Sequence, residues 1–534
     1  MCSSGDFRNG IFPNGIFPNG ALRKGALRLL TCSAVFVALP VMAQQAPLSA
    51  IDWLSESIAT PGAILRPVEP DIAKSGLAVP DEVVTSVLDG PSPDAAGLIA
   101  PSVSGLPRDL WGLGKTAEIV ALLASERADA LPALQQQFLT VLLAEATPPV
   151  DSGGKGVLLL ARVDKLLKIG ALEQAGALIE AAGAMKPDLF RRAFDIALLT
   201  GNEDAACAHL RQTPDLAPTY PARIFCLARS GDWNAAALTL QMAQALGYVS
   251  PAEDQLLSRF LDPALADDAP PLPPPDPVTP LTWRMLEAIG EGLPTGPLPL
   301  AFSHAELRDT AGWKARIEAS ERLARVGVIA PNQLLGIYTA RLPAASGGVW
   351  DRVEAFQRFD TALSAGDPGA VARALPDAFA RMAEAELEVP FADLFAARLM
   401  RLPLTGDVGA LAFRIALLSP QYESAARNRL PQDGMEAFLI GLAKGNLQGV
   451  SPPDSLARAI APAFVRPAPP PDLTELVTQN RLGEAILTAI DRISRGLEGD
   501  IRGVTEGLSL LREIGLDDLT RRTALELMLL ERRG

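Results

Sequence analysis

Three consecutive copies of one helical-hairpin pattern, between Val157 and Leu246, constrain the fold of this chain more than any other feature. Each copy ends its first helix at a glycine, and the glycines Gly170, Gly201 and Gly231 are 31 and 30 residues apart. Glycine suits a helix end because it adopts the left-handed conformation without a Cβ clash. A hairpin of this size cannot bury its own apolar stripe, so the copies must stack on one another.

The second helix of each copy carries a small residue that lets paired helices approach closely. An alanine lies five residues after each glycine, and an aliphatic residue follows four positions later. The alanines are Ala175, Ala206 and Ala236, and the aliphatic residues are Ile179, Leu210 and Leu240. This arrangement resembles the tetratricopeptide-like family of helical repeats, over residues 157–246, with the family's proline present only as Pro187. The resemblance implies a helical solenoid that serves as a binding scaffold.

We therefore predict an all-α fold, an α-solenoid of stacked helical hairpins with an extended, proline-rich N-terminal arm. Further turns between helices are predicted at Gly366, Gly406 and Gly445, now 40 and 39 residues apart, so the second half uses longer hairpins. The last helix, residues 517–533, has an apolar stripe and a charged face. Such a helix is typical of the element that caps one end of a solenoid.

Prolines mark the predicted domain boundaries. They recur through residues 44–108 and prevent long helices there, which predicts an extended arm that is either disordered or laid along the solenoid. A second proline-rich stretch, residues 267–280, is typical of a semi-rigid linker. The chain should thus contain an N-terminal helical-repeat domain over 109–266 and a C-terminal one over 281–534.

Residues 1–43 have the organisation of a short disordered tail followed by a secretory signal peptide. A tandem Asn-Gly-Ile-Phe-Pro repeat at 9–18 precedes basic residues at 23–28, an apolar run at 29–41 and a cleavage motif that ends at Ala43. For the tandem repeat, translated sequence upstream of the true start codon is the alternative. We predict cleavage near Ala43 and export to a bacterial periplasm, with no stable membrane span left afterwards.

The charge balance limits the possible partners. The formal net charge is -14, and an acidic surface argues against nucleic acids and anionic lipids, which bind clustered Lys and Arg. Hydrophobic residues make up 48% of the chain and aromatic residues 5%, and the difference consists largely of helix-forming Ala and Leu. A protein or peptide partner therefore fits this composition better than a polyanion.

Two cysteines remain after the predicted cleavage, Cys207 and Cys226. By the repeat pattern, Cys207 lies in the second helix of the second copy and Cys226 in the first helix of the third copy. These two helices should pack antiparallel. A disulfide between them would suit an oxidising periplasm and would stabilise the fold by roughly 3 kcal/mol. The alternative is two buried free thiols, because Cys often behaves as a small hydrophobic residue.

No residue pattern predicts a catalytic, cofactor-binding or metal site. The two histidines, His209 and His304, have no second ligand at zinc spacing. Residues 112–116 resemble the end of a phosphate-binding loop but lack its first glycine. Residues 152–155 match the Ser-x-x-Lys string of penicillin-binding enzymes without the partner Lys-Thr-Gly motif. We predict no cofactor and no bound metal.

The predicted function is that of an exported, non-catalytic bacterial scaffold that binds a protein or peptide partner in the cell envelope. The alternative is a peptidoglycan enzyme, or an activator of one, that uses a helical superhelix as a substrate guide. Glu56-Ser57 and Glu423-Ser424 match the Glu-Ser pair of soluble lytic transglycosylases, but neither precedes the Gly-Leu-Met-Gln stretch of that family. The identity of the partner and the oligomeric state stay open.

Overall fold

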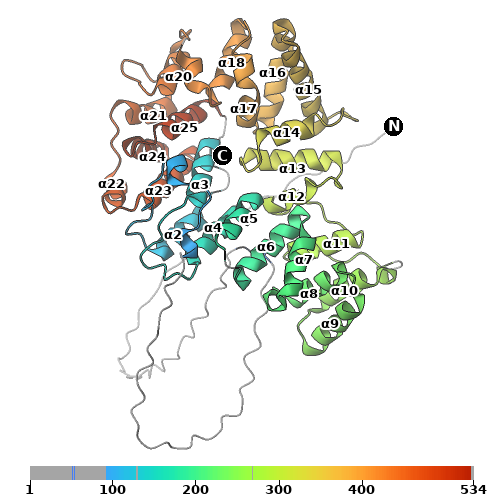
Figure 1. Ribbon diagram of the computed structural model, residues 1–534. Helices are drawn as coiled ribbons and strands as arrows, with labels where there is room; N and C mark the ends of the chain where they lie inside the picture. The colour runs from blue at the N-terminus through green and yellow to red at the C-terminus, as the bar shows by residue number, and fades with distance from the viewer. Residues whose placement is uncertain are drawn as a thin grey trace, which may run out of the picture. The chain divides into compact units, whose positions relative to one another are not determined.

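The computed structural model describes Ile51, Trp53 and Leu54 together with residues 92–127, 130–183, 185–266, 269–427 and 429–530. Within these residues every regular element is a helix, and the one extended pairing is an isolated parallel bridge between Ile99 and Ala144. The helices pack in a manner consistent with a helical solenoid (Figure 1). The predicted all-α fold is therefore confirmed.

The α-helices of the N-terminal half are α1 (Pro101–Ser104), α2 (Thr116–Ser125), α3 (Pro132–Leu143), α4 (Val157–Lys168), α5 (Leu172–Ala181), α6 (Pro187–Thr200), α7 (Glu203–Gln212), α8 (Tyr220–Arg229), α9 (Trp233–Leu246) and α10 (Pro251–Leu261). Those of the C-terminal half are α11 (Pro280–Ala288), α12 (Ser303–Glu306), α13 (Trp313–Arg325), α14 (Pro331–Tyr338), α15 (Val349–Ala365), α16 (Pro368–Glu384), α17 (Glu388–Leu399), α18 (Gly406–Leu417), α19 (Tyr422–Arg427), α20 (Gly434–Lys444), α21 (Ser455–Val465), α22 (Pro471–Thr478), α23 (Leu482–Leu497), α24 (Ile501–Glu513) and α25 (Asp517–Leu529). Short 3-10 turns occur at η1 (Pro93–Ala95), η2 (Pro214–Leu216), η3 (Pro263–Ala266) and η4 (Leu300–Phe302).

The three copies of the sequence pattern are the helix pairs α4/α5, α6/α7 and α8/α9. Each pair packs internally, and α5 also packs on α6 and α7 on α8, so consecutive hairpins are stacked. The turn glycines Gly170, Gly201 and Gly231 have φ values of 78°, 81° and 84°. An L side chain rarely adopts this conformation, which explains why glycine stands at all three turns.

Helix α6 shows how the sequence sets the limits of one repeat helix. Pro187 occupies its first position, where the missing N–H costs no hydrogen bond and the fixed φ suits the helix. Phe190, Phe194 and Leu198 follow at four-residue spacing and are buried on one face. Gly201 ends the helix in the left-handed conformation, and its N–H donates to the carbonyl of Ala197. The helix is thus limited by proline at its start and by glycine at its end.

The predicted turn glycines of the second half also have positive φ. Gly366 and Gly445 follow the last residues of α15 and α20, with φ values of 66° and 70°. Gly406 has a φ of 62° but is the first residue of α18, so it begins a helix and does not end one. The interhelical turn before α18 therefore lies upstream of this glycine.

The described parts of the N-terminal arm pack against the helices. Trp53 is buried and meets Phe302 edge to face, with the ring centroids 5.7 Å apart. The buried Asp94 carboxylate accepts hydrogen bonds from the backbone N–H groups of Gly156 and Leu159, at 3.2 and 2.8 Å, where α4 begins. These residues are laid along the solenoid.

The remainder of the predicted arm and the predicted tail and signal peptide, residues 1–43, lie outside the described residues. Across the described ranges, no helix has both the length and the apolar character that crossing a membrane requires.

The buried core continues across the proline-rich stretch 267–280. The larger apolar cluster includes residues on both sides of it, such as Leu166 of α4 and Leu323 of α13. The smaller cluster, built around α6 to α11, joins Leu257 to Leu281. Both predicted helical-repeat domains therefore contribute side chains to each apolar cluster.

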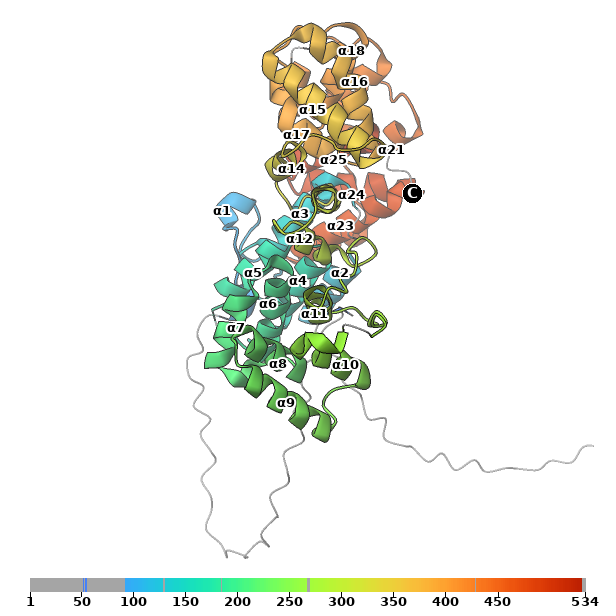
Figure 2. The same ribbon diagram turned by 90° about the vertical axis from the view of Figure 1, so that its right-hand side faces the viewer.

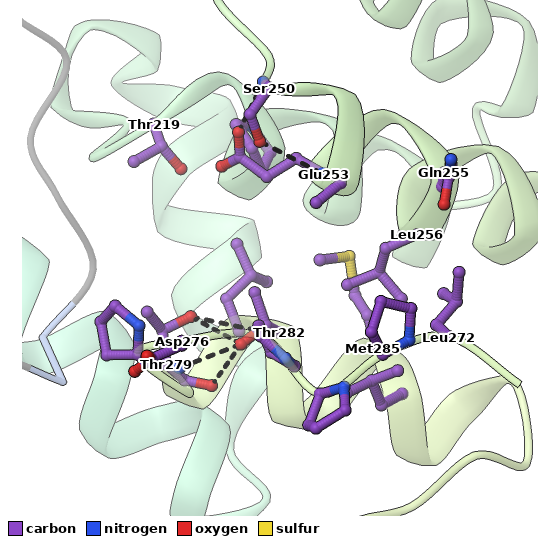
Figure 3. Close-up of a pocket in the computed structure, with 18 of the residues that line it drawn as sticks. Thr219, Ser250, Glu253, Gln255, Leu256, Leu272, Asp276, Thr279, Thr282 and Met285 are labelled. Carbon is purple, nitrogen blue, oxygen red and sulfur yellow. Dashed lines mark hydrogen bonds between the residues drawn. The ribbon is translucent and has the colours of Figure 1, made fainter.

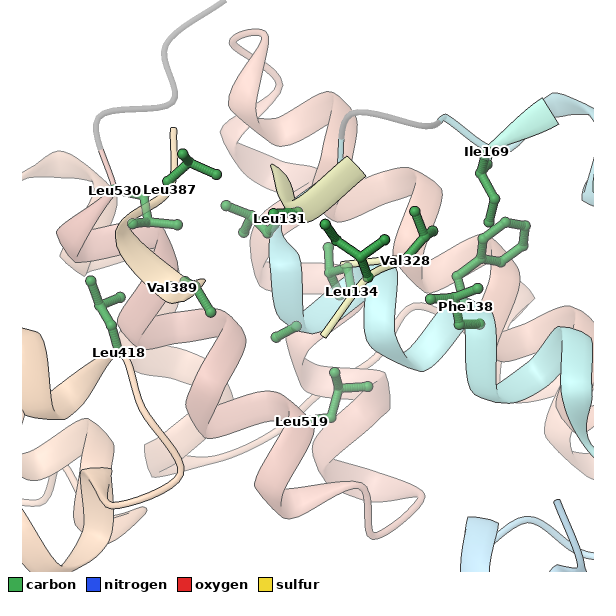
Figure 4. Close-up of a cluster of buried hydrophobic side chains, with 14 of the residues drawn as sticks. Leu131, Leu134, Phe138, Ile169, Val328, Leu387, Val389, Leu418, Leu519 and Leu530 are labelled. Atoms are coloured by element: carbon green, nitrogen blue, oxygen red, sulfur yellow. The ribbon is translucent and has the colours of Figure 1, made fainter. Parts of the chain in front are cut away.

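The last helices pack against the first ones. Helices α2 and α3 contact α23, and α3 also contacts α25, as both views show (Figure 1, Figure 2). The buried Glu526 carboxylate of α25 accepts hydrogen bonds at 2.8 and 3.1 Å from the N–H of Ala133 at the start of α3. Figure 4 shows Leu134 and Phe138 of α3 in the same apolar cluster as Leu519 of α25.

The prediction that the last helix caps one end of the solenoid is wrong. Helix α25 ends at Leu529 and packs against α3, α20 and α24. Ala524 and Leu525 are fully buried, and Thr520 and Thr523 are buried as well. A cap would leave one face in water, whereas α25 contacts neighbouring helices from both ends of the described chain.

Candidate binding groove

The residues that resemble a phosphate-binding loop, 112–116, hold α2 against the C-terminal helices. A Cβ atom on Gly112 would lie 1.7 Å from the carbonyl oxygen of Asn480, so glycine is needed there for close approach. The N–H and hydroxyl of Thr116 donate to the Asp151 carboxylate at 2.9 and 2.7 Å. These hydrogen bonds lower the pKa of Asp151. In this structure, Gly112 allows close packing on Asn480, and Asp151 caps the start of α2 through Thr116.

In the described part of the chain, the residues of the two serine motifs lie at the surface or partly exposed. The N–H of Ser152 donates to the carbonyl of Pro149 at 3.0 Å, and the three residues after Ser152 are exposed. Glu423 is an exposed residue of α19 that forms ion pairs, and the hydroxyl of Ser424 donates to the carbonyl of Gln421 at 2.8 Å. Glu56 lies outside the described residues.

Both histidines have packing roles. His304 is buried with its Nε2 atom 2.6 Å from the carbonyl oxygen of Gly170, and burial lowers its pKa. The His209 ring packs against Phe190, with the centroids 5.5 Å apart, and its Nε2 atom is buried without a hydrogen-bond partner in the described chain. Among the described residues, no group of His, Cys, Asp and Glu side chains is arranged to hold a metal ion.

Cys207 of α7 and Cys226 of α8 form a disulfide in the structure, with their Cα atoms 5.0 Å apart. Both residues are buried in the smaller apolar cluster. The bond therefore ties the second hairpin to the third, and it fixes helix α8, whose first residues line the groove described below.

Labelling of the denatured, unreduced protein should find no free thiol in the processed chain, because Cys207 and Cys226 are the cysteines that remain. An unprocessed chain should show two, Cys2 and Cys32. Replacing Cys207 and Cys226 with alanine should lower the free energy of unfolding by about 3 kcal/mol, measured by urea unfolding, because the bond closes a loop of roughly twenty residues. Two labelled thiols in the processed chain would contradict the disulfide.

A groove of about 630 Å³ opens between α10, α11 and the proline-rich segment that joins them (Figure 3). Glu253 and Leu256 lie on one side of it, and Asp276 and Met285 lie on the other. A volume of this size falls within the roughly 300–1,000 Å³ of typical ligand pockets.

Much of the groove wall is apolar or aromatic. Tyr220 and Tyr248 stack at one side, with their ring centroids 4.9 Å apart and their planes at 8°. The proline-rich segment forms another side and is fixed in place, since the N–H of Leu272 donates to the Glu291 carboxylate at 2.6 Å. Arg259 of α10 donates to the same carboxylate at 2.8 Å. The groove thus has a defined shape, held by hydrogen bonds at its rim.

Three helices begin at the groove, namely α8, α10 and α11. Each has a proline at its first or second position and a Ser or Thr cap whose hydroxyl accepts a hydrogen bond from a first-turn N–H. The caps are Thr219, Ser250 and Thr279, with hydrogen bonds of 3.1, 3.3 and 3.2 Å. In α10 the Glu253 carboxylate completes a capping box by accepting from the N–H of Ser250 at 2.8 Å.

An exposed apolar row leads toward the groove along α9. The fourteen residues of α9 contain no charged side chain. Leu238, Met242 and Leu246 recur every four residues and are 59%, 53% and 59% exposed. The row ends two positions before Tyr248, which lines the groove. Exposed apolar rows of this kind mark surfaces that contact a partner.

The sequence did not predict this groove, because the prolines at 267–280 are typical of a linker. Two signals were available in the sequence. The pairs Ser250-Pro251 and Thr279-Pro280 are typical helix starts, and α9 is an uncharged stretch in a chain with 21% charged residues. Neither signal reveals that residues 30 to 60 positions apart line one groove.

Comparison of the chain with models of known protein families, with curated proteins and with solved structures finds no match in any of the three.

Proposed function

We propose that this protein is a non-catalytic helical-repeat scaffold that binds a protein or peptide partner in the bacterial cell envelope. The observation that carries the proposal is the groove together with the uncharged, exposed row on α9. The row from Leu238 to Leu246 extends over about 12 Å at 1.5 Å per residue, in addition to the length of the groove itself. An extended apolar surface beside a pocket suits a polypeptide that inserts one side chain and lays its neighbours along a helix.

Export to the periplasm forms part of the proposal. It rests on the basic, apolar and small-residue segments that precede residue 44, and the disulfide between Cys207 and Cys226 is in keeping with an oxidising compartment.

Photo-crosslinking in the native host tests the proposal. The photoreactive residue p-benzoylphenylalanine replaces Tyr248 in one variant, Met242 in a second, and Leu430, which is 84% exposed, in a control. We expect one partner to be captured at the first two positions and not at the third. Once identified by mass spectrometry and purified, that partner should bind the purified protein, and Tyr220→Ala should weaken binding about 10-fold, because truncating a central aromatic residue typically costs over 1 kcal/mol.

Two kinds of outcome, one from binding and one from enzymatic activity, would contradict the proposal. One is that the same proteins are captured at all three positions, or that Tyr220→Ala leaves the affinity for the captured partner unchanged. The other is the release of muropeptides from purified peptidoglycan by the protein, which would favour the alternative of a cell-wall enzyme.

A further inference from the structure

The charged side chains that line the groove are both acidic. They are Glu253, at the start of α10, and Asp276, in the proline-rich segment, and no Lys, Arg or His is among the described residues of the lining. Figure 3 shows the two carboxylates on different sides of the groove. Asp276 has no ion-pair partner in the described chain, and Glu253 uses one carboxylate oxygen as an acceptor for the N–H of Ser250. Both can therefore receive a hydrogen bond from a cation in the groove.

The three helix starts do not turn the groove into an anion site. A helix N-terminus attracts anions through the N–H groups of its first turn. Here proline removes one of these donors from each helix, and the Ser or Thr cap occupies another. The prolines are Pro221 in α8, Pro251 in α10 and Pro280 in α11. With so few donors left, the two carboxylates dominate the local charge.

The apolar walls suit the remainder of a cationic side chain. The stacked Tyr220 and Tyr248 rings present an aromatic surface, and Leu272 and Pro273 add aliphatic surface. Lys and Arg bury their methylene stems on such surfaces while the charged head stays at a polar rim, and a cation is also attracted to an aromatic face. The net charge of -14 further favours the approach of a basic partner.

We propose that the groove binds a partner segment in which Lys or Arg lies next to a bulky apolar residue. The apolar residue contacts the tyrosine pair and the aliphatic wall, and the cation contacts Glu253 and Asp276. This inference rests on the proposed function, because it specifies the chemistry of the partner at the same groove.

Selection from a library of random dodecapeptides tests this inference on the purified protein. We expect the enriched peptides to contain Lys or Arg within two positions of a Leu, Met, Phe, Tyr or Trp. In fluorescence polarisation, one enriched peptide should bind about 3- to 10-fold more tightly with Lys than with Gln at that position, and most weakly with Glu. The preference for Lys should shrink as salt rises, because screening weakens the attraction.

Matched variants connect the preference to the groove. In Glu253→Gln/Asp276→Asn the Lys and Gln peptides should bind with nearly equal affinity, and Gln can still complete the capping box of α10. The control Glu423→Gln/Asp407→Asn loses the same charge from two exposed residues of α19 and α18, and it should keep the preference.

The outcomes separate the two proposals. If no peptide is enriched, the proposed function fails and the inference fails with it. If peptides are enriched without basic residues, or if Glu253→Gln/Asp276→Asn still prefers Lys, the peptide-binding function stands and the inference about its cation is overturned.

Discussion

Replacing Phe391 with alanine should lower the free energy of unfolding by about 3–5 kcal/mol, the range for deleting a fully buried aromatic side chain. Phe391 of α17 is completely buried among other aromatic rings. Its centroid lies 4.8 Å from Phe395, 5.1 Å from Phe359 of α15 and 5.8 Å from Phe379 of α16. Three helices therefore lose contacts together, and the cavity left behind cannot collapse onto one neighbour.

Urea unfolding followed by circular dichroism measures this change. Leu342→Ala serves as the control, because Leu342 is 82% exposed and its removal should change the free energy of unfolding by less than about 0.5 kcal/mol. A loss below about 1 kcal/mol for Phe391→Ala would contradict the aromatic packing between α15, α16 and α17.

Replacing Glu126 with glutamine should remove a large pH dependence of stability. Glu126 is buried at the end of α2, and burial, reinforced by the negative charge of Asp491, raises the pKa of its carboxyl group from 4.5 to about 8. Between these two values the folded chain holds a proton that the unfolded chain has released. The contribution of Glu126 to the free energy of unfolding of the natural protein should therefore fall by about 1.4 kcal/mol for each pH unit between these values.

The comparison of the two proteins isolates this group. The free energy of unfolding of Glu126→Gln minus that of the natural protein should increase by about 4 kcal/mol as pH rises from 5 to 8. Urea unfolding at each pH measures this difference. Parallel pH profiles of the two proteins would contradict the buried, protonated carboxyl group.

Above pH 8 the nearby Lys165 should act in the opposite direction. Burial lowers its pKa from 10.5 to about 8, so the unfolded chain holds the extra proton between these values. Its contribution to stability therefore increases from pH 8 to about 10.5.

The local architecture could be predicted from the sequence. Gly170, Gly201 and Gly231 locate three helix ends, and the apolar spacing of residues such as Phe190, Phe194 and Leu198 gives the buried faces of the hairpins. These features depend on residues within one or two helical turns of one another, which is the range over which sequence patterns are informative. The Cys207–Cys226 pairing follows from the same local frame.

The long-range features could not be predicted in this way. The Glu526 carboxylate accepts a hydrogen bond from the N–H of Ala133, which lies 393 positions earlier in the chain. Nothing in the charge of one glutamate indicates which backbone N–H it will bind. Residues 112–116 resemble a phosphate-binding loop in sequence, but glycine stands at position 112 because the Asn480 carbonyl oxygen needs the space. The groove likewise depends on how α8, α10 and α11 are arranged by tertiary packing.

The packing of α3 on α25 determines when this protein can finish folding. Ala133 is synthesised 393 residues before Glu526. At ~5–20 residues per second, roughly 20–80 s separate the two on the ribosome. During that interval the apolar face of α3, with Leu134 and Phe138, has no native partner in α25. The native packing of α3 is therefore complete only after the C-terminal helices have been synthesised.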